Sequence, residues 1–332
     1  MIWSDGYTSA YYATIVDAKS WRDTDHIRIV SGKISRTADE LMESADIEMT
    51  DPIGEQWIRV WLEAKQGGTE TVQLFTGLIS TPKRDIDGAR DSWKAECYSV
   101  LKPIDDILTD RGFYVPAGVP APQAAARLLR KGSAPVEVSD AAKPTLLEAI
   151  IAEDGETCLT MAKRVLEAIN WKIRIDGRGV IHLEPESDNV VLTLGQNDND
   201  IMELSVTDEQ DWFSCPNVLR AISDDLTAIA RDDDPGSKLS TVTRGREIWA
   251  EERSVTLSNN ESLSDYAYRR LRTLQSPARK ITYTRRYHPD VTVGSILHIK
   301  YPEIGIDGNF CVMSQTTELT HGGATKEEAV FV

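Results

Sequence analysis

The histidines, the side chains best suited to metal binding or acid–base chemistry, are few and scattered along the chain. They are His26, His182, His288, His298 and His321. No HxH or HExxH spacing places two of them together as metal ligands. His182 and His298 fall within alternating strand patterns, which favours hydrogen-bonded structural histidines over ligands. The histidine pattern therefore predicts neither a metal centre nor a catalytic residue.

The four cysteines, Cys97, Cys158, Cys215 and Cys311, lie far apart in the sequence. No CxxC motif or Cys/His cluster exists, which excludes a zinc ribbon and a thioredoxin-type motif. Two long-range disulfides remain an alternative. The start of the chain lacks the basic and apolar regions of a signal peptide, so we expect reduced, buried thiols. Nucleotide-binding and hydrolase motifs (GxGxxG, the phosphate-binding glycine–lysine loop, GxSxG) are absent.

Two acidic runs, Asn197–Asp200 and Asp232–Gly236, are the best candidates for a cation site. The first lacks the glycine and the later acidic residue of a calcium loop. In the second, neighbouring side chains diverge, and its Pro-Gly end marks a turn. We expect solvated loops, with no metal and no cofactor. A carboxylate pair of a glycoside hydrolase stays open as an alternative, because any acidic chain contains many such pairs.

Composition and charge restrict the partners. The 332 residues are 41% hydrophobic and 27% charged, as in a globular protein of two or three domains. Thirty-seven basic against 53 acidic residues give a net charge of −16. This acidity disfavours specific nucleic-acid binding, which depends on neutralising phosphates. No apolar run approaches the length of a membrane-spanning helix.

Charge is also segregated along the chain. Eleven acidic and three basic residues lie between Asp198 and Lys238, whereas seven basic and no acidic residues lie between Tyr266 and Tyr287. Two solvated faces of opposite sign would explain this pattern. The alternative is a pair of complementary surfaces in an oligomer or a heteromeric ring.

The elements that must position these side chains are mostly short strands. Period-two alternation and turn residues predict them at Tyr11–Ser20, Ile27–Ile34, Asp46–Met49, Trp57–Ala64, Thr71–Ile79, Ser92–Val100, Trp171–Ile175, Val180–Leu183, Val190–Leu194, Met202–Val206, Val218–Ser223, Leu226–Ala230, Glu247–Leu257, Lys280–Tyr287, Ile296–Lys300 and Asn309–Leu319. Helical spacing and caps predict helices at Gln123–Arg130, Thr145–Ala152, Glu156–Ile169 and about 262–275.

The order of these elements predicts a mainly β fold with an α+β insert. We expect a first β-barrel domain at 1–102, a small mixed α+β middle module at 103–187, and a second β-barrel domain with one helix at 188–332.

This order and several segments resemble the baseplate-hub family of phage tails, prophages and tailocins. The segments are Phe75–Ile79, Leu166–Ile181, Cys215–Val218, His288–Asp290, Val293–Leu297, Gly305–Val312 and His321–Gly323. The resemblance implies two tube-type β-barrels in each chain and a homotrimeric ring of six barrels. The ring would join the sixfold tail tube to a threefold spike or tip in the virion tail, assembled in the host cytoplasm.

The implied partners are the tail tube or distal tail protein, the spike, the tape-measure protein and other baseplate proteins. No reaction is implied. The alternatives are a tail-tip cell-wall hydrolase and a carbohydrate- or receptor-binding module, which could use Trp3, Trp21, Trp61 and Trp249 as exposed platforms. Trp at strand positions favours core or interface instead.

Three expectations follow. The middle module should lie outside the ring and contact neighbouring baseplate proteins. His182 and His298 should matter for stability only. The channel should be acidic, so that DNA passes without sticking. The basic stretch Arg269–Arg286 would then lie away from the channel, against acidic neighbours such as Asp224, Asp225 and Asp232–Asp234.

Overall fold

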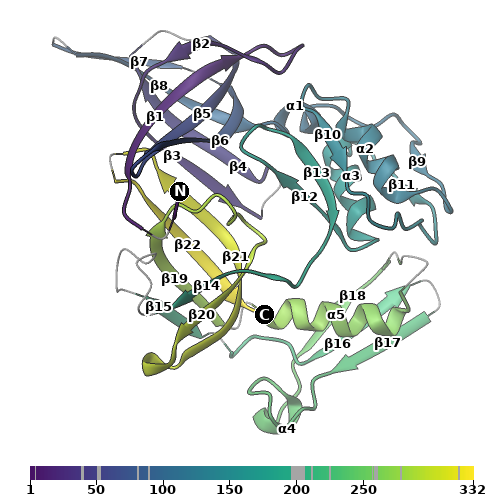
Figure 1. The fold of residues 1–332 in the computed structure, drawn as a ribbon. Helices are drawn as coiled ribbons and strands as arrows, with labels where there is room; N and C mark the ends of the chain where they lie inside the picture. The colour runs from purple at the N-terminus through teal and green to yellow at the C-terminus, as the bar shows by residue number, and fades with distance from the viewer. Residues whose placement is uncertain are drawn as a thin grey trace.

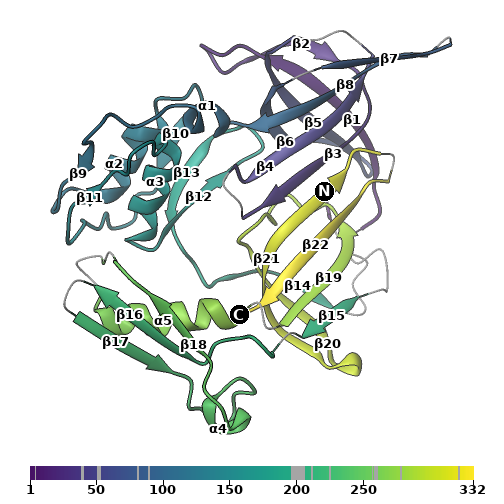
Figure 2. The same cartoon turned by 180° about the vertical axis from the view of Figure 1, so that it is seen from behind.

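The chain folds into a β-rich body with two smaller units at its side (Figures 1 and 2). The structure, a computed structural model, describes residues 1–3, 5–38, 41–50, 54–80, 82–88, 90–195, 206–210, 212–223, 226–255, 257, 261–276, 279–320 and 322–332. The predicted mainly β fold with a small α+β part is confirmed. Among the described residues, no helix is long and apolar enough to span a membrane.

The described residues of the first β-rich half form eight strands. They are β1 Thr8–Val16, β2 Asp23–Ile27, β3 Ile29–Thr37, β4 Glu43–Met49, β5 Trp57–Lys65, β6 Thr69–Ile79, β7 Lys83–Asp87 and β8 Arg90–Ser99. Alternate residues of these strands point inward onto one core that includes Ile34, Ile58 and Phe75. The expected strand at 11–20 ends at Val16, because the Asp17 carboxylate accepts hydrogen bonds that close a turn.

In the second β-rich half, six strands are formed by the residues that the structure describes. They are β14 Val190–Gly195, β15 Thr207–Gln210, β19 Arg279–Arg286, β20 Ile296–Tyr301, β21 Ile306–Glu318 and β22 Ala324–Phe331. A 3₁₀ turn, Pro302–Ile304, connects β20 to β21. A separate core, which includes Ile281, Leu297 and Phe310, fills this half.

The two halves share one sheet of 14 strands. Its main order is β15-β19-β22-β21-β3-β4-β8-β6-β5-β1-β2, with β20 beside β21, β14 beside β20, and β7 beside β8. Both halves curl (Figure 1), yet in the described part of the chain the hydrogen bonding leaves the sheet open at β2 and β15. The two expected barrels therefore take the form of two curled halves of one open sheet.

The middle module packs helices against small sheets. Its elements are α1 Lys102–Asp105, β9 Tyr114–Val115, α2 Ala121–Leu129, β10 Val136–Val138, β11 Ile150–Ile151, α3 Cys158–Glu167, β12 Trp171–Ile175 and β13 Ile181–Pro185. Its core continues into the first half through Trp57 and Val100. The helix predicted at Thr145–Ala152 is wrong: the Leu146 carbonyl accepts from Gly118, and β11 pairs with β9, so the segment is extended.

A separate lobe lies at the lower right of Figure 1. It contains β16 Val218–Ser223, β17 Leu226–Arg231, α4 Thr241–Arg244, β18 Trp249–Glu252 and α5 Leu263–Gln275. Helix α5 begins as predicted, because the Ser262 hydroxyl accepts from the Asp265 amide at 3.1 Å. Its apolar side covers one face of the three-stranded sheet β17-β16-β18 and buries Leu219 and Ala221.

Candidate functional site: the seam between the two halves

The two β-rich halves are joined by strands β3 and β21, whose pairing was not predicted from the sequence. Strand β21 runs antiparallel to β3, with Ser314 opposite Thr37 and Glu318 opposite Lys33. The paired residues lie from 277 (Thr37 and Ser314) to 285 (Lys33 and Glu318) positions apart in the chain, and their backbone groups form hydrogen bonds with one another. We call this junction the seam.

A ladder of charged and polar side chains crosses the inner face of the seam. Arg36 donates to Gln315 Oε1 at 2.9 Å, and its Nε lies 3.4 Å from Glu43 Oε2. Gln315 Nε2 donates to Glu327 Oε1 at 2.7 Å. Arg285 donates to both oxygens of Glu327, at 2.6 and 2.8 Å. The ladder therefore links the adjacent strands β4, β3, β21, β22 and β19 inside the protein.

Burial sets the electrostatics of this ladder. Burial raises the pKa of Glu43 to about 7, although the Arg36 guanidinium lowers it and the Asp176 carboxylate adds to the rise. Oε1 of Glu43 is buried without a hydrogen-bond partner. For Arg285, burial lowers the pKa, but the attraction of Glu327 outweighs burial and the net pKa is raised. The seam therefore contains one buried ion pair, Arg285–Glu327, and one carboxyl group, that of Glu43, whose pKa lies near neutral pH.

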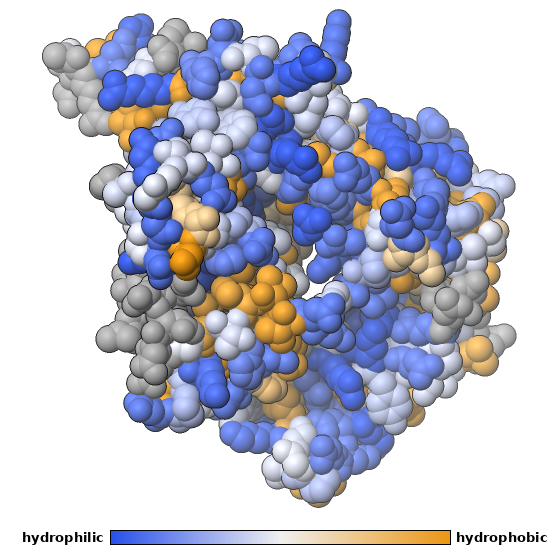
Figure 3. Space-filling view, viewed as in Figure 1, coloured by the Kyte–Doolittle hydropathy of each residue, from blue (hydrophilic) through white to orange (hydrophobic). Residues whose placement is uncertain are grey.

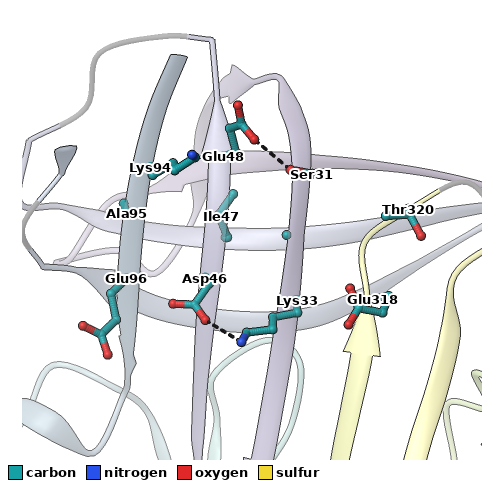
Figure 4. A pocket seen from close by; sticks show the side chains of 11 residues that line it. Ser31, Lys33, Asp46, Ile47, Glu48, Lys94, Ala95, Glu96, Glu318 and Thr320 are labelled. Carbon is teal, nitrogen blue, oxygen red and sulfur yellow. Dashed lines mark hydrogen bonds and ion pairs between the residues drawn. The ribbon is translucent and has the colours of Figure 1, made fainter. Parts of the chain in front are cut away.

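The opposite face of the seam is exposed and polar. Register places Glu318, Lys33, Asp46 and Glu96 side by side on β21, β3, β4 and β8. Lys33 Nζ lies 3.2 Å from Asp46 (Figure 4). These side chains line a shallow groove of about 510 Å³ together with Ser31, Gly32, Ile47, Glu48, Lys94, Ala95 and Thr320. The groove carries both signs of charge and offers no enclosed pocket for a substrate.

The hairpin of the middle module that connects β12 to β13 through Asp176 and Gly177, the Asp-Gly hairpin, packs against the first half. The Gly177 carbonyl accepts from Thr76 at 2.8 Å, and the Arg178 carbonyl accepts from Trp21 and Arg59 at 2.8 and 3.0 Å. A Cβ at residue 177 would lie 1.9 Å from the carbonyl oxygen of Gln73. Only glycine permits this close approach.

Asp176 holds the hairpin in shape. Burial raises the pKa of Asp176, but hydrogen bonds from the Val180 amide, His182 and Arg178 outweigh burial and hold it below its usual value. His182 Nε2 lies 3.2 Å from Asp176 Oδ2 and its Nδ1 lies 3.4 Å from Glu137. His182 therefore contacts the Asp176 carboxylate of the turn and the Glu137 carboxylate on β10. Both contacts are of a structural kind.

The other histidines do not converge with His182. His298 on β20 contacts Asn309 at 3.0 Å and Asp307 at 3.3 Å, both on the neighbouring strand β21. His26 packs against the Tyr12 ring in the first half, and His288 lies near Asp290. His321 lies outside the described residues. Where the chain is described, no group of three or more His, Cys, Asp or Glu side chains could hold a metal.

The second acidic run closes a loop. Asp232 accepts from Ser237 at 2.7 Å and from Gln275 at 3.2 Å, and Asp234 accepts from the Gly236 amide at 2.8 Å. The run Asn197–Asp200, most of the expected strand Met202–Val206, and Asp224 and Asp225 lie outside the described residues.

Five of the seven basic residues in the basic stretch form ion pairs within their own chain. Arg269 binds Glu261 at 2.8 Å and Arg270 binds Glu252 at 2.6 Å. Further along, Arg279 binds Asp208, Lys280 lies near Glu209 and Glu328, and Arg285 is buried against Glu327. These five residues therefore pair with carboxylates other than the expected Asp232–Asp234.

The cysteines are free. Cys97, Cys158 and Cys215 are buried and Cys311 is half-buried. Burial raises the pKa of the Cys97 thiol to about 12.

All four tryptophans considered as sugar platforms contact other residues of the chain. Trp3 packs on Tyr7 and Tyr287, and Trp61 stacks on Tyr12. Trp21 donates to Arg178. Trp249 is 43% exposed, donates to Glu247 at 2.9 Å, and has the guanidinium groups of Arg220 and Arg231 within 5.2 and 5.9 Å of its ring centroid.

Comparison with solved structures finds the same fold in tail proteins. The tail protein from Neisseria meningitidis MC58 superposes with a TM-score of 0.74 at 16% identity, over 98% of this chain and 97% of that one. The prophage MuSo2 43 kDa tail protein from Shewanella oneidensis gives 0.69 at 14% identity, over 97% and 98%.

An Escherichia coli component of the type VI secretion system, described as similar to the T4 tail proteins gp27 and gp5, gives a TM-score of 0.54 at 10% identity, over 92% and 74%. No family model and no curated protein sequence matches the chain, so the likeness lies in the fold.

The chain has the fold of phage tail baseplate-hub proteins. The resemblance suggested by the short sequence motifs is thereby confirmed. This fold spans nearly the full length of both tail proteins. Within this fold, the seam is the feature that turns two β-rich halves into one continuous surface.

Proposed function

We propose that the chain is a structural hub subunit at the tip of a phage tail or a phage-tail-like particle. The observation that best supports this proposal is the seam, where β3 pairs with β21 and makes one sheet from two halves. Each chain would thus supply two adjacent wall segments held in fixed register. Three chains would supply six segments, which matches a sixfold tube above and a threefold tip below.

In this proposal the homotrimer binds the tail tube or distal tail protein on one side and the spike or tip protein on the other. The tape-measure protein and other baseplate proteins are further partners in the virion tail, with assembly in the host cytoplasm. Obligate ring contacts of this kind bury about 2,000 Å² or more. The units 1–102, 103–187 and 188–332 remain the domain division that we propose.

The exposed face of the seam is the surface that we assign to the channel wall. Its strands present polar and charged side chains, such as Lys33 and Asp46, rather than apolar ones. The whole chain carries a net charge of −16, which supports an acidic channel through which DNA passes without binding to the wall. Arg285, inside the protein, cannot contact DNA in the channel.

We further propose that the chain catalyses no reaction. The dispersed histidines and the solvent-open groove support this view over a tail-tip hydrolase.

The oligomeric state tests the proposal. Light scattering of the purified chain after size exclusion should give three times the 37.0 kDa protomer mass. A monomer, or measurable turnover of peptidoglycan, would argue against a hub subunit.

A further inference from the structure

The middle module carries an apolar surface that its own chain leaves uncovered. Strands β9 and β11 form a two-stranded ribbon in which Val115 lies opposite Ile150 and Tyr114 opposite Ile151. Val115 and Ile150 are 3% and 4% exposed, because they face the core of the module. Tyr114 and Ile151 are 56% and 64% exposed on the other face. The ribbon is therefore apolar on both faces.

Two more exposed apolar side chains lie in the segments that lead into the ribbon. Leu147, four residues before Ile151, is 50% exposed, and Leu108, six residues before Tyr114, is 58% exposed. Apolar atoms lie among polar ones over the middle module at the right of Figure 3. A half-buried strand normally alternates apolar and polar residues, and adjoining exposed apolar side chains mark interaction sites.

Acidic side chains outnumber basic ones among the exposed residues of the segments that flank the ribbon. Asp110, Glu148, Glu153 and Asp154 are all exposed, whereas Arg111 and Lys143 are the exposed basic residues of the same segments. Arg164, which donates to the Ile151 carbonyl, is already paired with Glu156 at 2.9 Å. The rim is therefore net negative, and a partner that fits it has an apolar centre and a basic rim.

The position of the ribbon indicates which protein would bind it. It lies at the edge of the middle module farthest from the shared sheet (Figures 1 and 2). If the ring is built on the seam, this edge faces away from the ring axis. The basic stretch Arg269–Arg286 of a second copy is a poor counterpart, because four of its six arginines (Arg269, Arg270, Arg279 and Arg285) already bind carboxylates of their own chain.

We propose that the Tyr114/Ile151 surface docks a different structural protein of the particle, through a surface with an apolar centre and a basic rim. This inference rests on the proposed hub function. It assigns to the middle module the task of attaching the ring to the proteins around it.

Site-specific photocrosslinking in assembled particles tests the inference. Tyr114→p-benzoylphenylalanine keeps an aromatic side chain at the centre of the surface. Particles from cells that produce them are irradiated, and the protein bound to residue 114 is identified by mass spectrometry. We expect a different structural protein of the particle. Adding Ile151→Glu should reduce the crosslink about tenfold or more, as for a buried interface anchor.

Ile86→Glu is the matched control, because Ile86 is 66% exposed on β7, also opposite an antiparallel neighbour. It should leave the crosslink within about twofold. Paired Glu153→Lys and Asp154→Lys should weaken the crosslink, since they reverse the charge of the rim. A crosslink to a second copy, no crosslink, or equal loss with Ile86→Glu would each overturn the inference. The mass of the purified chain distinguishes failure of the docking proposal from failure of the hub proposal. A trimeric mass without a crosslink at residue 114 would contradict the docking proposal and would still support the hub function.

Discussion

Arg285 and Glu327 form an ion pair that solvent does not reach. Arg285 Nη2 lies 2.6 Å from Glu327 Oε1, and the two side chains are 1% and 0% exposed. Through Gln315 this pair continues to Arg36 in the other half of the sheet. Buried ion pairs add little net stability, but loss of one partner leaves an uncompensated charge. The stability of the seam therefore depends on both Arg285 and Glu327.

Removing one charge of this pair should destabilise the fold strongly. We expect Glu327→Gln to lower the free energy of unfolding by about 3 kcal/mol or more in urea titrations. Lys33→Ala, which removes the exposed pair with Asp46, should cost about 1 kcal/mol or less. Joint replacement by Arg285→Met and Glu327→Leu should restore most of the loss. Equal effects of the two single variants would contradict a buried, coupled ladder.

Glu43 should make stability depend on pH. Its pKa is raised from 4.5 to about 7, so the folded state binds more protons than the unfolded chain between these values. The contribution of Glu43 to stability is therefore greatest below pH 4.5 and is lost as pH rises to about 7. Glu43→Gln should gain roughly 3 kcal/mol relative to wild type over this interval. Parallel pH profiles of urea unfolding would refute this role.

Gly177 should tolerate no side chain. A Cβ there would lie 1.9 Å from the Gln73 carbonyl oxygen, so Gly177→Ala must move the hairpin off the first half. We expect a loss of about 3 kcal/mol and faster proteolysis between the middle module and the first half. Gly68→Ala is the control, because nothing lies within 4 Å of a Cβ at that turn. Similar melting temperatures for both variants would argue against the close approach.

His182 and His298 should affect stability alone. Their partners are carboxylate and amide groups of neighbouring elements, so His182→Gln and His298→Gln should lower the melting temperature only slightly. Wild-type protein should release no sugars or peptides from peptidoglycan. A hydrolytic rate that either variant abolishes without unfolding would show that the chain has a catalytic centre.

Local patterns predicted most elements of the fold. Alternation located β5 and β6, and the Ser262 cap located α5, because these signals reside in neighbouring residues. The helix expected at Thr145–Ala152 failed because pairing with β9 and contact with Gly118 outweigh a short helical pattern. The final strand β22 was not predicted, since its buried Glu327 breaks the apolar alternation.

The seam itself could not be predicted, since Arg36, Gln315 and Glu327 are polar residues that ordinarily signal a solvated face. Their partners are distant in sequence, and only the fold brings them together. The strands Trp171–Ile175 and Val180–Leu183 were predicted, but the contact of the turn between them with Gln73 depends on the packing of two units. Gln73 and Gly177 carry no sequence signal of that contact.

An electron-microscopy map of the assembled particle tests the central claim most directly. The account predicts three copies of this chain in one ring, with the strands of the seam side by side and Lys33 and Asp46 facing the channel. A ring of six copies, or one in which the seam faces outward and the middle module lines the channel, would contradict it.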